Sequence, residues 1–93
     1  MINKNILRLR KELDKLDNKF LDLIKKRTYL VNKVLQNKRY KKDIIDKKRV
    51  KKILLNINKK SKIKKIDPII TNRIWKSMIK AYIDFEFRNF NKK

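Results

Sequence analysis

Apolar residues recur at alternating steps of three and four along the first third of the chain. The large apolar residues between positions 6 and 23 are Ile6, Leu9, Leu13, Leu16, Phe20 and Leu23. This spacing is the heptad rhythm of a long helix with one apolar stripe. It predicts a helix over Ile6–Lys38 that runs on to about residues 38–40, with solvated charges on its outer face.

A cation interrupts this stripe. An apolar residue is due at position 27, where the chain has Arg27, and Arg10 and Lys38 lie at the edges of the same stripe. A cation on an apolar surface loses hydration and is rarely tolerated without an anionic partner. Two explanations stay open at this point. Arg27 pairs with a carboxylate elsewhere in the core, or the stripe lines a pocket for an anionic ligand.

The length of the predicted helix bears on the oligomeric state. A helix of roughly 33 residues is about 50 Å long, whereas a compact domain near this size has a radius of gyration of only ~13 Å. The remaining residues cannot cover such a stripe alone. We therefore expect the helix to pack against a second chain.

Two shorter helices are predicted after a basic linker. Asp46 is placed to cap a second helix over Asp46–Asn58, with Arg49 at the edge of its apolar face. That face consists of Val50, Ile53, Leu54 and Ile57. A loop of Lys, Ser and Ile is expected over Lys59–Ile66.

The third helix is expected to begin at Asp67 and Pro68, a capping carboxylate followed by proline at the first helical position. Its broad apolar face is interrupted by Glu86, one turn after Tyr82. Residues 1–93 are thus predicted to form a single all-α domain of one long and two shorter helices.

Composition removes several kinds of chemistry. The chain has no Cys and no His, which excludes disulfides and makes a zinc site implausible. The first residues lack an apolar signal core and no apolar run approaches a membrane span, so a soluble cytoplasmic protein is expected. No hydroxyl–imidazole or thiol–imidazole pair is available for acyl transfer.

The net charge of +21 suggests a nucleic-acid-binding protein, because clustered cations release counterions from phosphate backbones. However, only seven of the thirty cations are Arg, and Lys, Asn and Ile, all encodable by A/T-rich codons, make up about half of the chain. Genome composition alone can enrich Lys on solvated faces. A helical nucleic-acid-binding or scaffolding dimer therefore stays the alternative outside the enzymes.

Four cations on apolar edges and one inward acid are what the sequence offers for chemistry. The cations are Arg10, Arg27, Lys38 and Arg49, and the acid is Glu86. Such a set suits a small dianion whose reaction needs neither a nucleophile nor a base. Catalysis would come from holding one conformer and stabilising charge as it develops.

These residues resemble the all-helical chorismate mutases. Residues 9–17, Leu-Arg-Lys-Glu-Leu-Asp-Lys-Leu-Asp, look like the opening Leu-Arg-x-x-Ile-Asp-x-Ile-Asp motif of that family. Arg27 and Lys38 are similar to its helix-1 arginine and to the lysine eleven residues on. Residues 46–49 resemble the Asp-x-x-Arg that opens its second helix, and Glu86 falls where the family usually has Gln. The resemblance covers about residues 6–90.

The resemblance implies conversion of chorismate to prephenate by an intertwined homodimer with two equivalent sites and no cofactor. The resemblance further implies that Arg10 reaches into the partner subunit's site. There it would bind the substrate carboxylates together with Arg27 and Arg49. It also implies that Lys38 and Glu86 donate hydrogen bonds to the ether oxygen. Tyr82 takes a position that often bears a small or polar pocket residue.

One departure from the family pattern concerns the substrate hydroxyl. Many members have Glu directly after the helix-2 arginine to contact that hydroxyl, but this chain has Val50, so Asp46 or a backbone group would have to serve. Arg followed by Val also occurs in the related isochorismate-pyruvate lyases. That activity is the alternative within the family.

Overall fold

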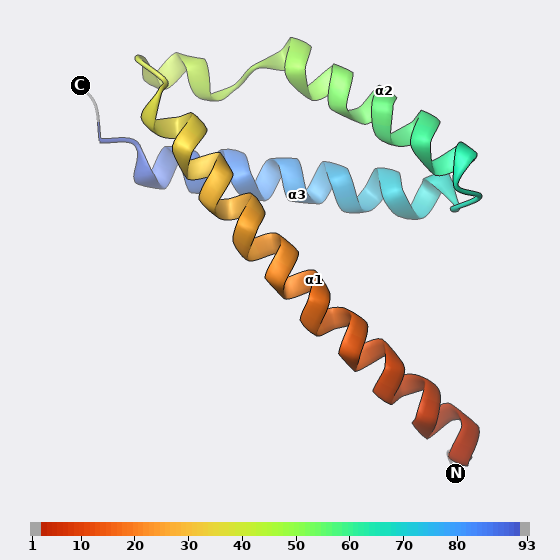
Figure 1. The fold of residues 1–93 in the computed structure, drawn as a ribbon. Coiled ribbons are helices and arrows are strands. Elements are labelled where there is room, and N and C mark those ends of the chain that lie inside the picture. The colour runs from red at the N-terminus through yellow and green to blue at the C-terminus, as the bar shows by residue number, and fades with distance from the viewer. Residues whose placement is uncertain (1–2, 92–93) are drawn as a thin grey trace. The chain divides into compact units, whose positions relative to one another are not determined.

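The computed structural model describes residues 3–91, which form three α-helices and one short 3₁₀ helix and contain no strand. The helices are α1 (Lys4–Gln36), η1 (Lys41–Ile44), α2 (Lys47–Ile63) and α3 (Pro68–Asn89) (Figure 1). The all-α prediction with one long and two shorter helices is therefore confirmed. The chain divides into two units, one ending at Val31 and the other beginning at Asn32.

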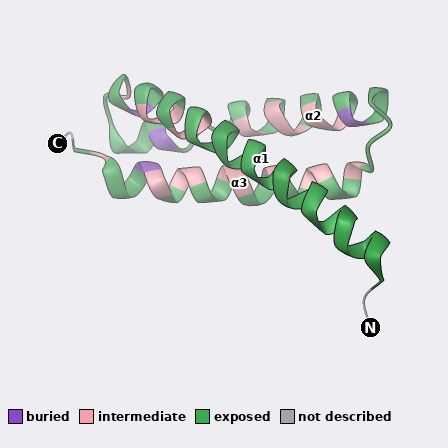
Figure 2. Cartoon of the chain, turned by 60° about the horizontal axis from the view of Figure 1, so that its bottom comes forward, coloured by how far each residue is buried: buried purple, intermediate pink, exposed green. Residues whose placement is uncertain are grey.

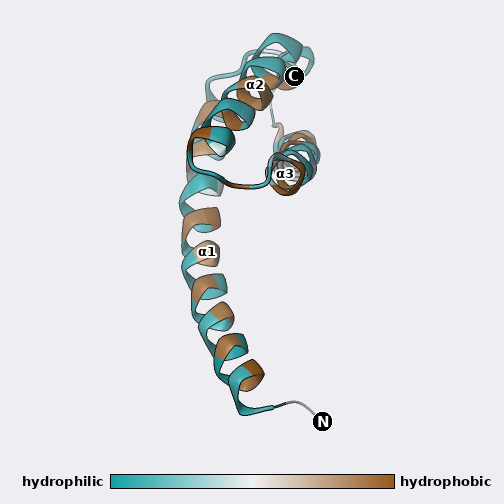
Figure 3. Cartoon of the chain, turned by 90° about the vertical axis from the view of Figure 1, so that its right-hand side faces the viewer, coloured by the Kyte–Doolittle hydropathy of each residue, from teal (hydrophilic) through white to brown (hydrophobic). Residues whose placement is uncertain are grey.

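The first unit is the greater part of α1. The side chain of Asn3 accepts a hydrogen bond from the backbone N–H of Ile6 at 2.9 Å, so the helix begins at Lys4, two residues before the predicted start. Apolar residues recur along α1 (Figure 3), and the whole stripe is exposed: Leu13, Leu16 and Leu23 keep 57%, 56% and 62% of their surface accessible. Within this chain, the stripe is uncovered.

The end of α1, in the second unit, falls short of the prediction. The helix ends at Gln36, where the side-chain amide of Asn37 donates to the Lys33 carbonyl at 2.9 Å and satisfies one of the last carbonyls. The backbone N–H of Lys38 donates to the Leu35 carbonyl at 3.0 Å, three residues back, so the chain tightens after the helix. Lys38 thus lies just beyond the helix instead of on its flank.

The linker between α1 and α2 contains the unpredicted helix η1. Tyr40 and Asp43 close it reciprocally: the Tyr40 N–H donates to the Asp43 carboxylate at 3.1 Å, and the Asp43 N–H donates to the Tyr40 carbonyl at 2.9 Å. This turn buries Ile44, and η1 packs against α3, where the Lys41 ammonium lies 6.0 Å from the Phe87 ring centre.

The helix α2 starts where predicted and ends later. Asp46 caps it, accepting from the Arg49 N–H at 3.0 Å. Its C-terminus is Ile63, not Asn58, so the loop predicted over residues 59–66 is wrong for its first half. The added turn is held by Ser61, which is buried and donates to the Ile57 carbonyl at 2.6 Å.

The helix α3 begins as predicted, at Pro68 with Asp67 accepting from the Ile69 N–H at 2.9 Å. It packs along α2 (Figures 1 and 2). Near the connecting turn the two helices share a hydrogen-bonded hydroxyl pair, buried Ser61 Oγ and partly buried Thr71 Oγ1, 2.7 Å apart. The hydroxyl pair fixes the register of the two helices at this end.

The turn after α2 is a Schellman motif made without glycine. The Ile66 N–H donates to the Ser61 carbonyl at 2.8 Å and the Lys65 N–H to the Lys62 carbonyl at 3.1 Å. This motif requires a left-handed residue, which is Lys65 with φ 59°. A residue with a Cβ atom is disfavoured there by roughly 1–2 kcal/mol relative to the right-handed conformation.

We expect Lys65→Gly to raise the free energy of unfolding by about 1 kcal/mol, because glycine adopts positive φ without the steric cost. Urea denaturation followed by circular dichroism measures the change. Lys64→Gly is the matched control: it removes the same charge at φ −82°, where glycine brings only backbone entropy, and it should lower stability. Equal shifts in the two variants would contradict the strain at Lys65.

Candidate functional site

The centre of the candidate site is an ion pair between Lys38 and Glu86. The Lys38 ammonium lies 3.0 Å from Oε2 and 3.3 Å from Oε1 of the Glu86 carboxylate, and it also donates to the Ile44 carbonyl oxygen at 3.3 Å. The Glu86 side chain is 8% exposed and that of Lys38 is 19% exposed. The pair joins the segment after α1 to the last turns of α3.

The local sequence explains why both side chains point inward. Glu86 occupies an inward position on the apolar face of α3, as predicted, and is among the few buried residues described. Lys38 can reach it because α1 stops at Gln36, and η1 then presents the Ile44 carbonyl to the same ammonium. An acid buried in this way needs a cation, and Lys38 supplies it.

The pairing shows what Glu86 does without substrate. A carboxylate that accepts from an ammonium offsets the charge of that ammonium. The same contact places Lys38 and Glu86, the two residues expected at the ether oxygen, within 3.0 Å of each other. The structure therefore brings the two residues together, while their roles toward a substrate stay predictions.

The other predicted residues of the second unit lie on α2 and α3. Asp46 and Arg49 form the first turn of α2, and both are exposed. Val50 follows on the partly buried side. Tyr82, one turn before Glu86, is partly buried and meets the Phe85 ring edge-on, with ring centres 6.4 Å apart.

Arg10 and Arg27 belong to the first unit. Arg10 is exposed and Arg27 is partly buried on α1, as expected for an edge position and an inward position of the stripe. Their place relative to Lys38 and Glu86 stays a prediction.

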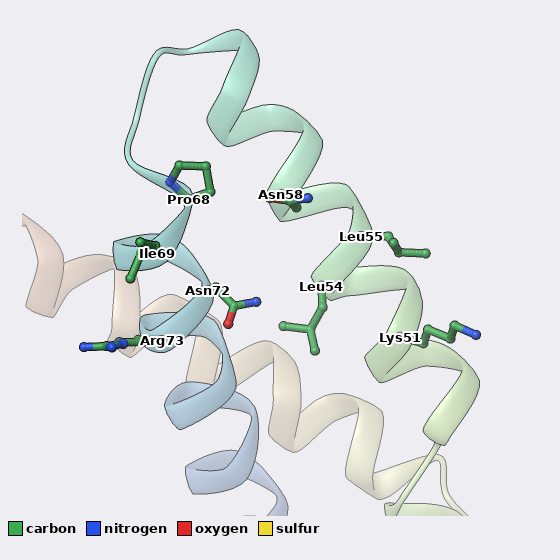
Figure 4. Close-up of a pocket in the computed structure, with 8 residues that line it drawn as sticks. All are labelled: Lys51, Leu54, Leu55, Asn58, Pro68, Ile69, Asn72 and Arg73. Carbon is green, nitrogen blue, oxygen red and sulfur yellow. The ribbon is translucent and has the colours of Figure 1, made fainter.

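A cleft that the sequence did not predict opens between α2 and α3 near their connecting turn. It has a volume of about 450 Å³ and is lined by Lys51, Leu54, Leu55, Asn58, Pro68, Ile69, Asn72 and Arg73 (Figure 4). None of the predicted site residues lines it. Its floor is mostly apolar, and Leu55 and Ile69 remain 54% and 62% exposed.

Within residues 3–91, no group of three or more acidic side chains is placed to hold a metal ion. No α-helix in the described range combines the length and the apolar character needed to cross a bilayer.

No curated protein and no solved structure matches this chain. A family model does. The family model described as chorismate mutase type II matches residues 9–87. This range runs from α1 to α3 and includes every predicted site residue, from Arg10 to Glu86. Because the match covers most of the 93 residues, the chain belongs to the chorismate mutase type II family, which is a family of isomerases.

Proposed function

We propose that this protein converts chorismate to prephenate, a one-substrate Claisen rearrangement that serves aromatic amino-acid synthesis in the cytoplasm. The observation that carries the proposal is the Lys38–Glu86 contact, at the two positions expected beside the breaking C–O bond, in a chain of the chorismate mutase family. The reaction needs no nucleophile and no base. The side chains act by binding one conformer of the dianion and stabilising charge on the ether oxygen.

The ammonium of Lys38 has the donors that this role needs. It carries three N–H groups, of which one serves the Ile44 carbonyl and one can be shared between the two oxygens of Glu86. On substrate binding, the ammonium would donate to the ether oxygen, where negative charge grows in the transition state. Ile44 and Glu86 thereby fix the direction of the ammonium before substrate arrives.

The two substrate carboxylates are assigned to the arginines. Arg27 and Arg49 would bind them from the same subunit and Arg10 from the partner, because a guanidinium donates to a carboxylate through two parallel N–H groups. The exposed first turn of α2 leaves Arg49 accessible for this contact. Tyr82 would line the pocket on α3.

Val50 favours a second candidate within the family. It follows Arg49 and cannot accept a hydrogen bond from a substrate hydroxyl, and it matches the Arg-Val pair of the isochorismate-pyruvate lyases. Asp46 can still accept from the hydroxyl, since only Oδ1 of its carboxylate serves the Arg49 N–H. The product decides between the two activities.

The product experiment incubates purified protein separately with chorismate and isochorismate. We expect prephenate from chorismate, whereas pyruvate and a benzoate from isochorismate would assign the lyase. Lys38→Ala should lower the rate of prephenate formation by about 10²–10³-fold, as the loss of one transition-state donor does. Lys51→Ala, which removes an equal charge from an exposed position on α2, should leave it near that of the wild type. No product from either substrate would reject the enzyme assignment.

We further propose a homodimer in which α1 of one subunit completes the site of the other. The support is the apolar stripe of α1, which is about half exposed or more from Leu9 to Leu23. Exposed apolar surface of this extent marks an interface, because its burial stabilises association by roughly 25 cal/mol per Å². A second copy offers the same stripe in return.

Subunit mixing tests the proposed role of Arg10. Arg10→Ala and Arg27→Ala homodimers should both be inactive, each lacking one carboxylate contact in both sites. In a heterodimer of the two variants, one site has both arginines intact if Arg10 serves the partner. Activity should then return to about one quarter of the wild-type rate in an equimolar mixture, since half of the dimers carry one good site. A mixture that stays inactive would place Arg10 and Arg27 in the same subunit's site.

Glu86 gives the proposed reaction a dependence on pH. Only a protonated carboxyl group can donate to the ether oxygen, because a carboxylate can only accept. In the substrate-free protein Glu86 accepts from Lys38. The donor role therefore requires a proton that is taken up with the substrate.

We expect kcat/KM for prephenate formation to rise as pH falls from about 8 to about 5, because the donor role needs a proton from solution. Glu86→Gln donates at every pH, so its profile should be flat and its activity near pH 7 retained. If Glu86 acts only by offsetting the charge of Lys38, the opposite holds. The wild-type rate would then be flat or fall with acidification, and the Gln variant would be impaired at neutral pH.

A further inference from the structure

The most strongly charged part of the molecule is α2 with the turn that follows it. Residues 47–66 contain ten cations and no acid, while all nine acids of the chain lie elsewhere. One of the ten, Arg49, is assigned to the substrate. The other nine are lysines, and none of the proposed catalytic contacts involves them.

Five of the lysines share one exposed side of α2, which we call the lysine face. Its members are Lys48, Lys51, Lys52, Lys59 and Lys62, and all are exposed. Helical spacing places them opposite the partly buried residues Val50, Ile53 and Ile57, which lie on the side that packs against α3. From Lys48 to Lys62 the face is about 21 Å long.

The charges on this face repel one another in the isolated protein. Lys48 and Lys52 are like charges at i,i+4, and such pairs destabilise a helix. The first turn of α2 is Lys47, Lys48 and Arg49, next to the positive end of the helix dipole, with only Asp46 to oppose them. Within residues 3–91, the lysine face forms no ion pair. A polyanion would relieve this repulsion.

We propose that the lysine face binds the phosphodiester backbone of nucleic acid without reading its sequence. Phosphates rise by ~3.4 Å along each strand, so a face of about 21 Å spans roughly six of them. The α2 helix has no aromatic residue on which a base could stack, and its face carries lysines, which act as point charges, not the arginine forks that read guanine. The interaction is thus electrostatic and independent of the proposed catalysis.

The experiment measures binding to a fluorescein-labelled DNA duplex of arbitrary sequence by fluorescence anisotropy, at several salt concentrations from about 50 to 200 mM. With four to five phosphate contacts, log K should fall against log salt with a slope of about −4. The variant Lys48→Gln, Lys52→Gln and Lys59→Gln should bind roughly 100-fold more weakly at 0.1 M salt, with a slope shallower by about 3.

The matched control carries Lys11→Gln, Lys15→Gln and Lys19→Gln on α1. These lysines are equally exposed, and their loss changes the net charge by the same three units, but Glu12, Asp14 and Asp17 are interleaved with them. The control should keep most of the affinity and most of the salt slope. Glutamine is a good helix former, and circular dichroism checks that both variants stay folded.

Three results would overturn the proposal. The first is equal loss of affinity in the two variants, because binding would then follow net charge and not the lysine face. The second is a wild-type affinity independent of salt. The third is binding to vesicles of phosphatidylserine that depends on the same three α2 lysines while the duplex is not bound, which would assign the face to a membrane surface.

Discussion

The Lys38 ammonium organises the second unit, because three separate segments of the chain meet at this group. It follows the end of α1, donates to a carbonyl of η1 and pairs with a carboxylate near the end of α3. The desolvation of Glu86 is offset by this cation, so removing Lys38 leaves the buried carboxylate without its ion-pair partner. The contact that stabilises the fold is also the one we propose for catalysis. In the proposed reaction the substrate would meet groups already held in place, and little reorganisation would be left for the reaction itself.

The second constraint is how little of this chain is buried. Leu35 and Ile44 are the only buried apolar residues described, and the facing sides of α2 and α3 are only partly covered. The polar contacts at the two ends of the second unit, Lys38 with Glu86 and Ser61 with Thr71, fix the arrangement more specifically than the apolar contacts do. The proposed dimer provides the missing apolar cover through α1.

The sequence predicted those features that depend on local chemistry. Asp46 and the Asp67-Pro68 pair mark helix starts through capping, and the apolar periodicity placed Glu86 inside α3. The end of α2 was missed because its lysine-rich segment has no apolar rhythm, and because a Schellman turn without glycine gives no signal in the sequence. The helix η1 was missed for a related reason, since its closure by Tyr40 and Asp43 is visible only from the hydrogen bonds.

The candidate site was predictable to different degrees. The proximity of Lys38 and Glu86 followed from the family resemblance, whereas the hydrogen bond from Lys38 to the Ile44 carbonyl depends on where α1 stops. The arginines of α1 are recognisable from the stripe they interrupt. The proposed approach of Arg10 to the substrate depends on a second chain, about which a single sequence carries only the indirect evidence of an uncovered surface.

The exposed stripe of α1 has a consequence for how the amount of protein governs its behaviour. A chain whose apolar cover comes from another molecule gains its stability by mass action, so its folded fraction depends on total concentration. Dilution would then separate and unfold the subunits, and the proposed active sites would be lost in the same step. The proposed activity per molecule would then rise with protein concentration. The cell would set the total activity partly through the number of copies it makes.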